Sequence, residues 1–147
     1  MPVPSPTTTT ACPGCGAVLV AVPDEHAHPG ASPSCTRLFD VTLRGLREEA
    51  AADRSAAAAI RLADAAYDAQ HPAPGEPARL AEALAVLTAR LGGPAPDRTP
   101  ACRPGAWQMT VSDVAADLDV VDLAALIETW AGTVLSDCRS ALDCFDT

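Results

Sequence analysis

The residues whose chemistry is easiest to interpret are two cysteines near the N-terminus, Cys12 and Cys15, within the pentapeptide Cys-Pro-Gly-Cys-Gly. A two-residue spacing lets both thiolates face one ion, and glycines let backbone N–H groups turn toward the sulfur atoms. Thioredoxin-like redox sites share this spacing, but they lie at a helix start within a βαβ unit, a pattern that this sequence lacks. The pentapeptide therefore predicts a zinc site.

The third zinc ligand must come from elsewhere in the chain, because zinc takes four ligands and the sequence contains no second Cys-X-X-Cys. Cys35 directly follows Ser32-Pro33-Ser34, a sequence typical of a helix start. The positive end of a helix stabilises a thiolate at this position. We therefore predict Cys35 as the third ligand.

Two histidines compete for the fourth position, His71 and His26. Cys35 and His71 are equally far along the chain from Asp53, where a turn between two helices is expected, so antiparallel helices would bring both ends together. This argument favours His71, with His26 as the alternative. His71 can also be interpreted as a helix C-cap whose ring binds a terminal carbonyl, and His26 as an exposed loop residue. With His71 as the fourth ligand, His26 and His28 would be outer-shell or solvent-facing groups.

A second set of residues offers proton-transfer chemistry. Asp64, Tyr67 and His71 lie on one face of a predicted helix, and an acid, a phenol and an imidazole in a row can move protons. The same three can instead form a buried set in which Tyr67 and Asp64 orient the histidine.

Two functions follow from these residues. In the first, a (Cys)3-His zinc site is structural and lies beside a small-molecule pocket. In the second, the chain is a zinc-dependent enzyme of lyase, cyclase or hydrolase type, acting on a small metabolite of bacterial specialised metabolism. His71 would then be the general acid or base, and the metal would keep an open position for water or substrate.

The elements that must position these residues are mostly helices. Hydrophobic residues make up 48% of the chain but aromatic residues only 3%, which favours closely packed helices of alanine, leucine and valine over a sheet. Helical periodicity and capping residues predict helices over residues 34–51, 53–70 and 77–91, and a short helix near Thr110 and Asp113. A last helix is expected to bury one apolar face, formed by Leu123, Leu126, Ile127, Trp130, Val134, Leu142 and Phe145. The predicted fold is mainly α, a four- to five-helix bundle with an N-terminal loop-rich zinc knuckle.

The predicted domain organisation is simple. Residues 1–11 are rich in proline and threonine and should form a disordered lead-in, and residues 12–147 should form a single zinc-stapled helical domain. The long loop before Thr110 contains Cys102 and Trp107 and is either a lid or a plain surface loop. Cys102, Cys138 and Cys144 have no ligand spacing, so we interpret them as buried or incidental thiols.

Charge and composition exclude several classes of partner. The formal net charge is -9, all ten basic residues are arginine, and the chain has no basic run, which argues against nucleic acid and anionic membranes. The N-terminus has neither a charged region nor an apolar region of the signal-peptide kind, so we expect a cytoplasmic protein. In a reducing compartment, six cysteines indicate metal ligands or free thiols rather than disulfides. The expected partners are a small-molecule ligand or another protein.

The chain resembles an actinobacterial family of unknown function. Members of that family carry CPGCG, an SPxCW-like turn and DAYxxQHP, which correspond here to the pentapeptide from Cys12, to Ser32-Pro33-Ser34-Cys35 and to the segment from Tyr67 to Pro72. Thr36 replaces the tryptophan, and Ala65 replaces the motif aspartate, leaving Asp64 one position early. The resemblance implies a bacterial source and supports the grouping of these residues, but it implies no activity.

Overall fold

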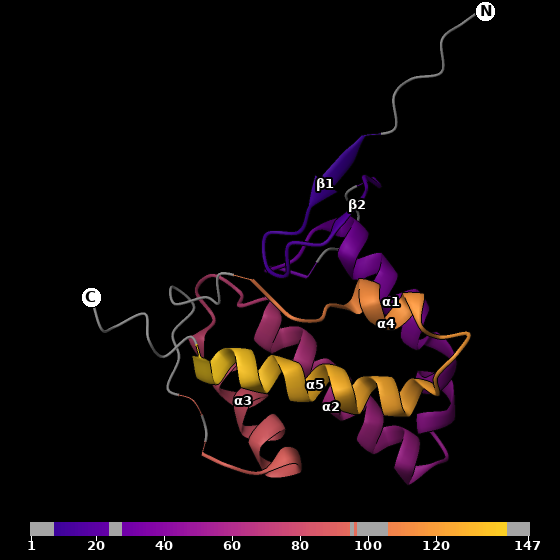
Figure 1. The fold of residues 1–147 in the computed structure, drawn as a ribbon, viewed down its shortest axis with the longest axis vertical. Helices are drawn as coiled ribbons and strands as arrows, with labels where there is room; N and C mark the ends of the chain where they lie inside the picture. The colour runs from indigo at the N-terminus through magenta and orange to yellow at the C-terminus, as the bar shows by residue number, and fades with distance from the viewer. Residues whose placement is uncertain (1–7, 24–27, 95, 97–105, 141–147) are drawn as a thin grey trace, which may run out of the picture.

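The computed structural model describes residues 8–23, 28–94, 96 and 106–140. Its elements in chain order are two strands, β1 (Thr9–Ala11) and β2 (Val18–Val20), and five helices, α1 (Pro33–Ala50), α2 (Arg54–Gln70), α3 (Pro77–Leu91), α4 (Val111–Ala116) and α5 (Leu123–Ser140). Figure 1 shows the strands at one end of the molecule, with α1 leading from them into the bundle. The predicted fold class, mainly helical with a small cysteine-bearing N-terminal unit, is confirmed.

The N-terminal unit is an antiparallel hairpin in which Thr9 pairs with Val20 and Ala11 with Val18. Its turn is the predicted zinc-binding pentapeptide. The Cys12 N–H donates to the Ala17 carbonyl and the Gly16 N–H donates to the Cys12 carbonyl, both at 2.9 Å. Gly16 has a φ of 79°, a left-handed conformation that glycine adopts without steric cost. The last glycine of the pentapeptide is therefore required by the turn itself.

Residues 9–11 differ from the expected disordered lead-in, because they form β1 and pair with β2. A threonine-rich segment has little to bury on its own, but the neighbouring strand supplies partners for its backbone N–H and carbonyl groups. Residues 1–7 of that prediction lie outside the described part of the chain, which starts at Thr8.

The first two helices begin and end at the residues that the sequence indicates. Ser32 caps α1 by accepting a hydrogen bond from the Cys35 N–H, and Pro33 occupies the first turn. Asp53 caps α2 by accepting from the Ser55 N–H, and α2 ends at Gln70, with His71 as its C-cap. Pro72 then prevents further helix, because proline disfavours the helical conformation of the residue before it.

The remaining helices also match the prediction. Pro77 opens α3, and Gly92, with a φ of 90°, ends it. Thr110 and Asp113 form the expected capping box at the start of α4. α5 buries Leu126, Ile127, Trp130 and Val134 as predicted, but Leu123 at its start is only partly buried. Leu142 and Phe145 lie outside the described residues.

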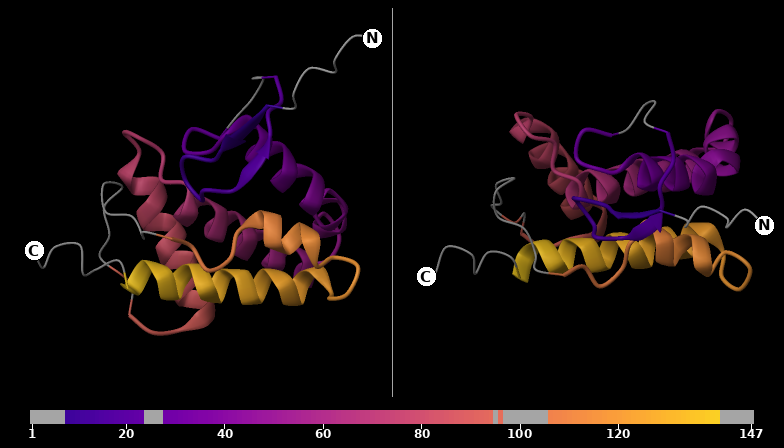
Figure 2. Two further views of the ribbon diagram at one scale, coloured as in Figure 1. Left: turned by 45° about the horizontal axis from the view of Figure 1, so that its top comes forward. Right: turned by 90° about the horizontal axis from the view of Figure 1, so that it is seen from above.

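α2 is the central helix of the bundle and packs against α1, α3 and α5. Ala63, Ala66 and Ala69 on α2 are fully buried, and such small side chains let neighbouring helices approach closely. Trp130 of α5 is also fully buried and fills the space beside them. The two further views in Figure 2 show α4 lying alongside α5, in agreement with the contacts between these helices.

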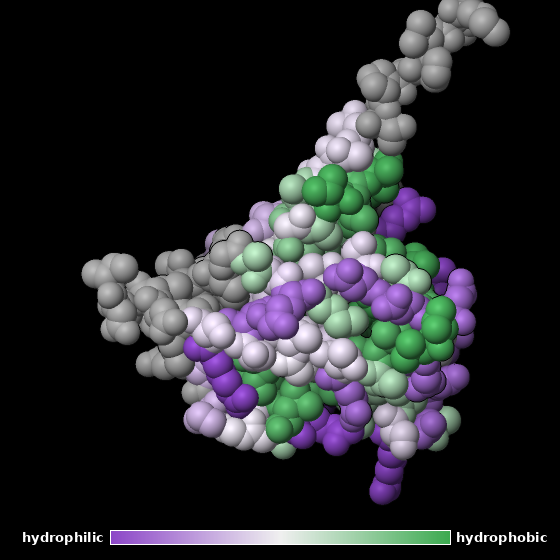
Figure 3. Space-filling model, viewed as in Figure 1, coloured by the Kyte–Doolittle hydropathy of each residue, from purple (hydrophilic) through white to green (hydrophobic). Residues whose placement is uncertain are grey.

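The surface of the hairpin is apolar. Val18 and Val20 are 65% and 55% exposed, and Figure 3 shows hydrophobic residues gathered at this end of the molecule. Among the helices in the described part of the chain, none is long and apolar enough to cross a membrane.

A buried polar network ties α2 to α5 and to the segment before α4. The Trp130 indole N–H donates to the Gln70 side-chain oxygen at 3.1 Å, and the Gln70 amide nitrogen donates to the Met109 carbonyl at 2.7 Å. Gln70 is fully buried, so its amide satisfies two polar groups that water does not reach.

Replacing this amide tests the network. We expect Gln70→Leu to lower the free energy of unfolding by about 2 kcal/mol or more, because each buried polar group left unpaired costs about 1–3 kcal/mol. Urea denaturation followed by circular dichroism measures the change. Gln108→Leu is the matched control, since Gln108 is exposed and Asp137 keeps its bond from the Gln108 backbone N–H. Equal losses in both variants would contradict the assignment.

Candidate metal centre

The structure brings Cys12, Cys15, Cys35 and His71 together in one buried cluster. Their ligand atoms all lie within 4.8 Å of one another, and all four residues are buried. Cys12 and Cys15 come from the hairpin turn, Cys35 from the first turn of α1, and His71 from the C-cap of α2. Three separate parts of the chain thus converge on one point.

The spacing of these atoms fits a tetrahedral ion. With Zn–S bonds of about 2.3 Å and a Zn–N bond of about 2.0–2.1 Å, a tetrahedral site places two sulfurs about 3.8 Å apart and a sulfur and nitrogen about 3.5 Å apart. The Cys15 and Cys35 sulfurs are 3.8 Å apart, and the Cys35 sulfur is 3.5 Å from the His71 Nε2. These two pairs are therefore at zinc-coordination spacing, and the donor types, three soft sulfurs and one imidazole, also suit zinc.

The imidazole of His71 is held in the tautomer that a metal ligand requires. Its Nδ1 lies 2.6 Å from the Tyr67 carbonyl oxygen, an acceptor only, so Nδ1 carries the proton and donates it. Nε2 then presents its lone pair to the cysteines. The expected C-cap role of His71 and its expected ligand role are thus compatible, because each uses a different ring nitrogen.

Hydrogen-bond donors surround the sulfur atoms. The Ser32 N–H donates to the Cys12 sulfur at 3.5 Å, and the Tyr67 hydroxyl donates to the Cys35 sulfur at 3.3 Å. Cys35 also lies in the first turn of an eighteen-residue helix, where the helix dipole places partial positive charge. These groups favour the thiolate form that metal binding requires.

The three cysteines shift one another's pKa values in the metal-free protein. Hydrogen bonds from Cys15 and Cys35 hold the pKa of Cys12 far below its usual range. The bond to Cys12, together with burial, raises the pKa of Cys15 to about 11, and the pKa of Cys35 is raised further for the same reasons. The opposite directions of these shifts favour a metal-free cluster in which Cys12 is the thiolate and Cys15 and Cys35 keep their protons.

Glycines allow the hairpin to approach the end of α2 closely. A Cβ atom on Gly14 would lie 2.5 Å from the His71 ring and 2.7 Å from the Gly30 carbonyl oxygen. A Cβ atom on Gly30 would lie 2.7 Å from the His71 carbonyl carbon and 2.8 Å from the Pro72 oxygen. Both positions are thus filled by backbone or by a ligand, and any side chain there would push the cysteines away from His71.

Trp107 fixes the hairpin from its other side. Its indole N–H donates to the Gly14 carbonyl at 2.9 Å. This tryptophan belongs to the long loop in which a lid was considered. Cys102 and most of that loop lie outside the described residues, but Trp107 itself holds the turn that carries Cys12 and Cys15.

The proton-transfer set predicted on α2 separates in the structure. Asp64 points to Arg47 of α1 and binds both of its terminal nitrogens, at 2.6 and 3.1 Å. Tyr67 contacts Cys35 of the buried cluster, and His71 is one of its four donors. Asp64 therefore does not orient the histidine, because one helical face spans two different environments, the buried cluster at its end and the surface near its middle.

His28 has a structural role that the sequence did not indicate. Its Nδ1 accepts from the Gly30 N–H at 3.0 Å, so Nε2 carries the proton and donates to the Asp68 carboxylate at 2.8 Å. Asp68 also pairs with Arg79 of α3 at 3.2 Å. Both nitrogens of His28 are therefore engaged. No local motif marks this pair, since the residues are far apart in sequence.

The other residues considered as ligands or thiols lie away from the cluster or outside the description. His26 and Cys144 are outside the described residues, so the alternative with His26 as the fourth ligand stays untested. Cys138 is fully buried in α5, as expected of a hydrophobic thiol, and is not among the four clustered donors.

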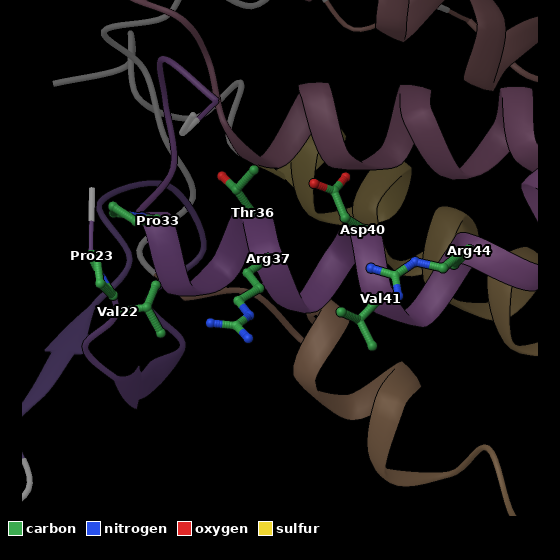
Figure 4. Close-up of a pocket in the computed structure, with 8 residues that line it drawn as sticks. All are labelled: Val22, Pro23, Pro33, Thr36, Arg37, Asp40, Val41 and Arg44. Atoms are coloured by element: carbon green, nitrogen blue, oxygen red, sulfur yellow. The ribbon is translucent and has the colours of Figure 1, made fainter. Parts of the chain in front are cut away.

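An open cleft of about 460 Å³ lies beside the metal cluster and shares Tyr67 with it. Its lining residues come from the hairpin side, α1, α2 and α3: His28, Thr36, Phe39, Asp40, Asp64, Tyr67, Asp68 and Arg79. His71 is not among them. A second hollow of about 500 Å³, shown in Figure 4, lies where Val22 and Pro23 meet the N-terminal half of α1, and Arg37 and Arg44 are its basic groups.

A methyl group at Gly30 tests the close approach. We expect Gly30→Ala to lower the free energy of unfolding by about 1–3 kcal/mol, because backbone must move to admit the extra carbon. Gly45→Ala is the matched control: Gly45 faces open space within α1, and alanine there should stabilise the helix by about 0.5–1 kcal/mol. Urea denaturation measures both. The same sign of change in the two variants would refute the steric argument.

Comparison with known proteins agrees with the expected resemblance to a family without an assigned activity. No curated protein and no solved structure matches the chain. The model of a family of unknown function, DUF5946, matches residues 10–102, which is more than half of the 147-residue chain and includes all four clustered donors and helices α1 to α3. The chain therefore belongs to the family of unknown function DUF5946.

Proposed function

We propose that this protein binds one zinc ion through Cys12, Cys15, Cys35 and His71, and that the ion is structural. The observation that carries the proposal is the buried set of three sulfurs and one nitrogen at zinc-coordination spacing. Three thiolates and an imidazole are a closed structural set, in which the protein supplies every ligand.

The hairpin is the part of the chain that most needs such an ion. It contains two strands of three residues, and a lone two-stranded hairpin is marginally stable in water. Its outward residues Val18 and Val20 are exposed, so its apolar side chains contribute little burial. Zinc coordination would attach the hairpin to both α1 and α2, and the binding energy would then become folding energy.

The geometry gives little support to a catalytic zinc. A catalytic site keeps one position open for water or substrate, whereas the proposed site would use four protein donors, the full number for a tetrahedral ion. His71 is fully buried, and its two ring nitrogens face the Tyr67 carbonyl and the cysteines. His71 therefore has no nitrogen with which to act as general acid or base on a bound metabolite.

The place best suited to a small molecule is the cleft lined by Tyr67, which also contacts Cys35 of the cluster. Its volume of about 460 Å³ is within the range of about 300–1,000 Å³ that ligand sites occupy. Because His28 reaches this cleft from the hairpin side, zinc that fixes the hairpin would also shape the cleft.

Substitution of one predicted ligand tests zinc binding. We expect native mass spectrometry to detect one zinc ion per chain in the unaltered protein and none in Cys35→Ser. A hydroxyl is a poor ligand for an ion otherwise held by thiolates. Cys138→Ser is the matched control: Cys138 is equally buried but is not one of the four clustered donors, so its variant should retain zinc. Full zinc occupancy in Cys35→Ser would refute the site.

X-ray absorption at the zinc edge separates the structural role from the catalytic one. A first shell of three sulfurs and one nitrogen is expected for the closed site. A shell with a water oxygen in place of the imidazole nitrogen would favour the catalytic reading instead.

Proton release provides an independent prediction. Because the pKa of Cys12 is lowered while those of Cys15 and Cys35 are raised, zinc entering the folded metal-free protein at pH 7.5 should displace about two protons. Isothermal titration calorimetry in buffers of different ionisation enthalpy measures this number. Release of about three protons would show that the thiols do not share a charge before zinc binds.

A further inference from the structure

We infer that Tyr67 is the positioning residue of the zinc site: its backbone carbonyl orients His71, and its hydroxyl orients Cys35 and disperses the charge of that thiolate. The inference rests on the proposed zinc site and assigns a role to a residue that is not itself a ligand. The carbonyl accepts from the His71 Nδ1 at 2.6 Å, and the hydroxyl donates to the Cys35 sulfur at 3.3 Å. One residue therefore contacts ligands that come from two different helices.

The buried charge of the site explains why a hydroxyl is useful there. Three thiolates around a divalent ion leave a net negative charge, and burying a charge is costly unless hydrogen bonds stabilise it. Cys35 is the most deeply buried of the three cysteines, at 0% exposure against 3% for Cys12 and 7% for Cys15. Its sulfur is thus the one for which a donor from the protein matters most.

Packing alone does not account for a tyrosine at this position. The Tyr67 ring stacks on Phe39 with ring centroids 4.0 Å apart and an interplanar angle of 11°. The Tyr67 and His28 rings form a T-shaped pair with centroids 5.3 Å apart. A phenylalanine would preserve both ring contacts. The hydroxyl adds a polar atom to a residue that is 2% exposed, and this atom is directed at a sulfur.

The hydrogen bond between the Tyr67 oxygen and the Cys35 sulfur runs from the hydroxyl to the sulfur, because a thiolate can only accept.

The test uses cobalt as a spectroscopic probe in the zinc site. In the cobalt-loaded Tyr67→Phe protein, we expect the thiolate-to-cobalt charge-transfer bands to move to lower energy, because a thiolate without its hydrogen bond gives up electron density more readily. Zinc affinity, measured by competition with a chromophoric chelator, should fall about 10-fold or more, as is usual when an outer-shell partner of a ligand is removed.

Two control variants separate the hydroxyl from packing and from the rest of the helix face. Phe39→Leu removes the stacked ring but keeps the hydroxyl, so it should lower stability without moving the charge-transfer bands. Asp64→Asn alters the same face of α2 at a residue bound to Arg47 and should change neither bands nor affinity. Band energies and zinc affinity of Tyr67→Phe equal to those of the unaltered protein would overturn the inference.

A measurement on the unaltered protein covers the case in which Tyr67→Phe does not fold. Tyr67 is the only tyrosine of the chain, so selective ¹³Cζ labelling gives a single resonance. That resonance should shift on zinc loading and shift again when cadmium replaces zinc; an unchanged position would overturn the inference. If the unaltered protein bound neither zinc nor cobalt, the proposed function itself would fail, whereas normal metal binding with an insensitive tyrosine would remove only the role of Tyr67.

Discussion

The structure depends on the convergence of three chain segments at one buried point, the cluster of Cys12, Cys15, Cys35 and His71. The hairpin contributes two sulfurs but little apolar burial, so it has few other means of attachment to the helices. α1 begins at the cluster and α2 ends there, which means that the helical hairpin places its two open ends against the same point. The glycines at positions 14 and 30 permit this approach, because no side chain separates the hairpin from the end of α2.

The second requirement is electrostatic. Thiolates beneath the protein surface need donors, and the structure supplies them from the Ser32 backbone, the first turn of α1 and the Tyr67 hydroxyl. The donors come from parts of the fold that are rigid for other reasons, since Ser32 is a helix cap and Tyr67 is stacked in the core. The residues that cap a helix or pack in the core therefore also supply hydrogen bonds to the cysteine sulfurs.

α2 connects the cluster to the rest of the bundle. Its buried alanines let α1, α3 and α5 approach, and its last turn carries Tyr67, Gln70 and His71. Gln70 binds Trp130 and the Met109 carbonyl, while the next residue, His71, faces the cysteines. The packing of the core and the geometry of the cluster are consequently coupled through two adjacent residues, so a substitution that alters one should also alter the other.

The sequence by itself determined the helices, because local signals specify them: Ser32 and Asp53 as caps, Pro72 and Gly92 as stops, and leucines at helical spacing. It also indicated Cys12, Cys15 and Cys35, since two-residue spacing and a helix start are local features, and it favoured His71 through the symmetry of the helical hairpin. Only the tertiary structure decided the rest. Contacts between segments distant along the chain decide that Tyr67, and not Asp64, meets the cluster. Such contacts also decide that His28 binds Asp68 and that Trp107 holds the turn. The close approach at Gly30 is a contact of the same kind. Such contacts follow from how helices are rotated and how closely backbones approach, and no local pattern of residues encodes either.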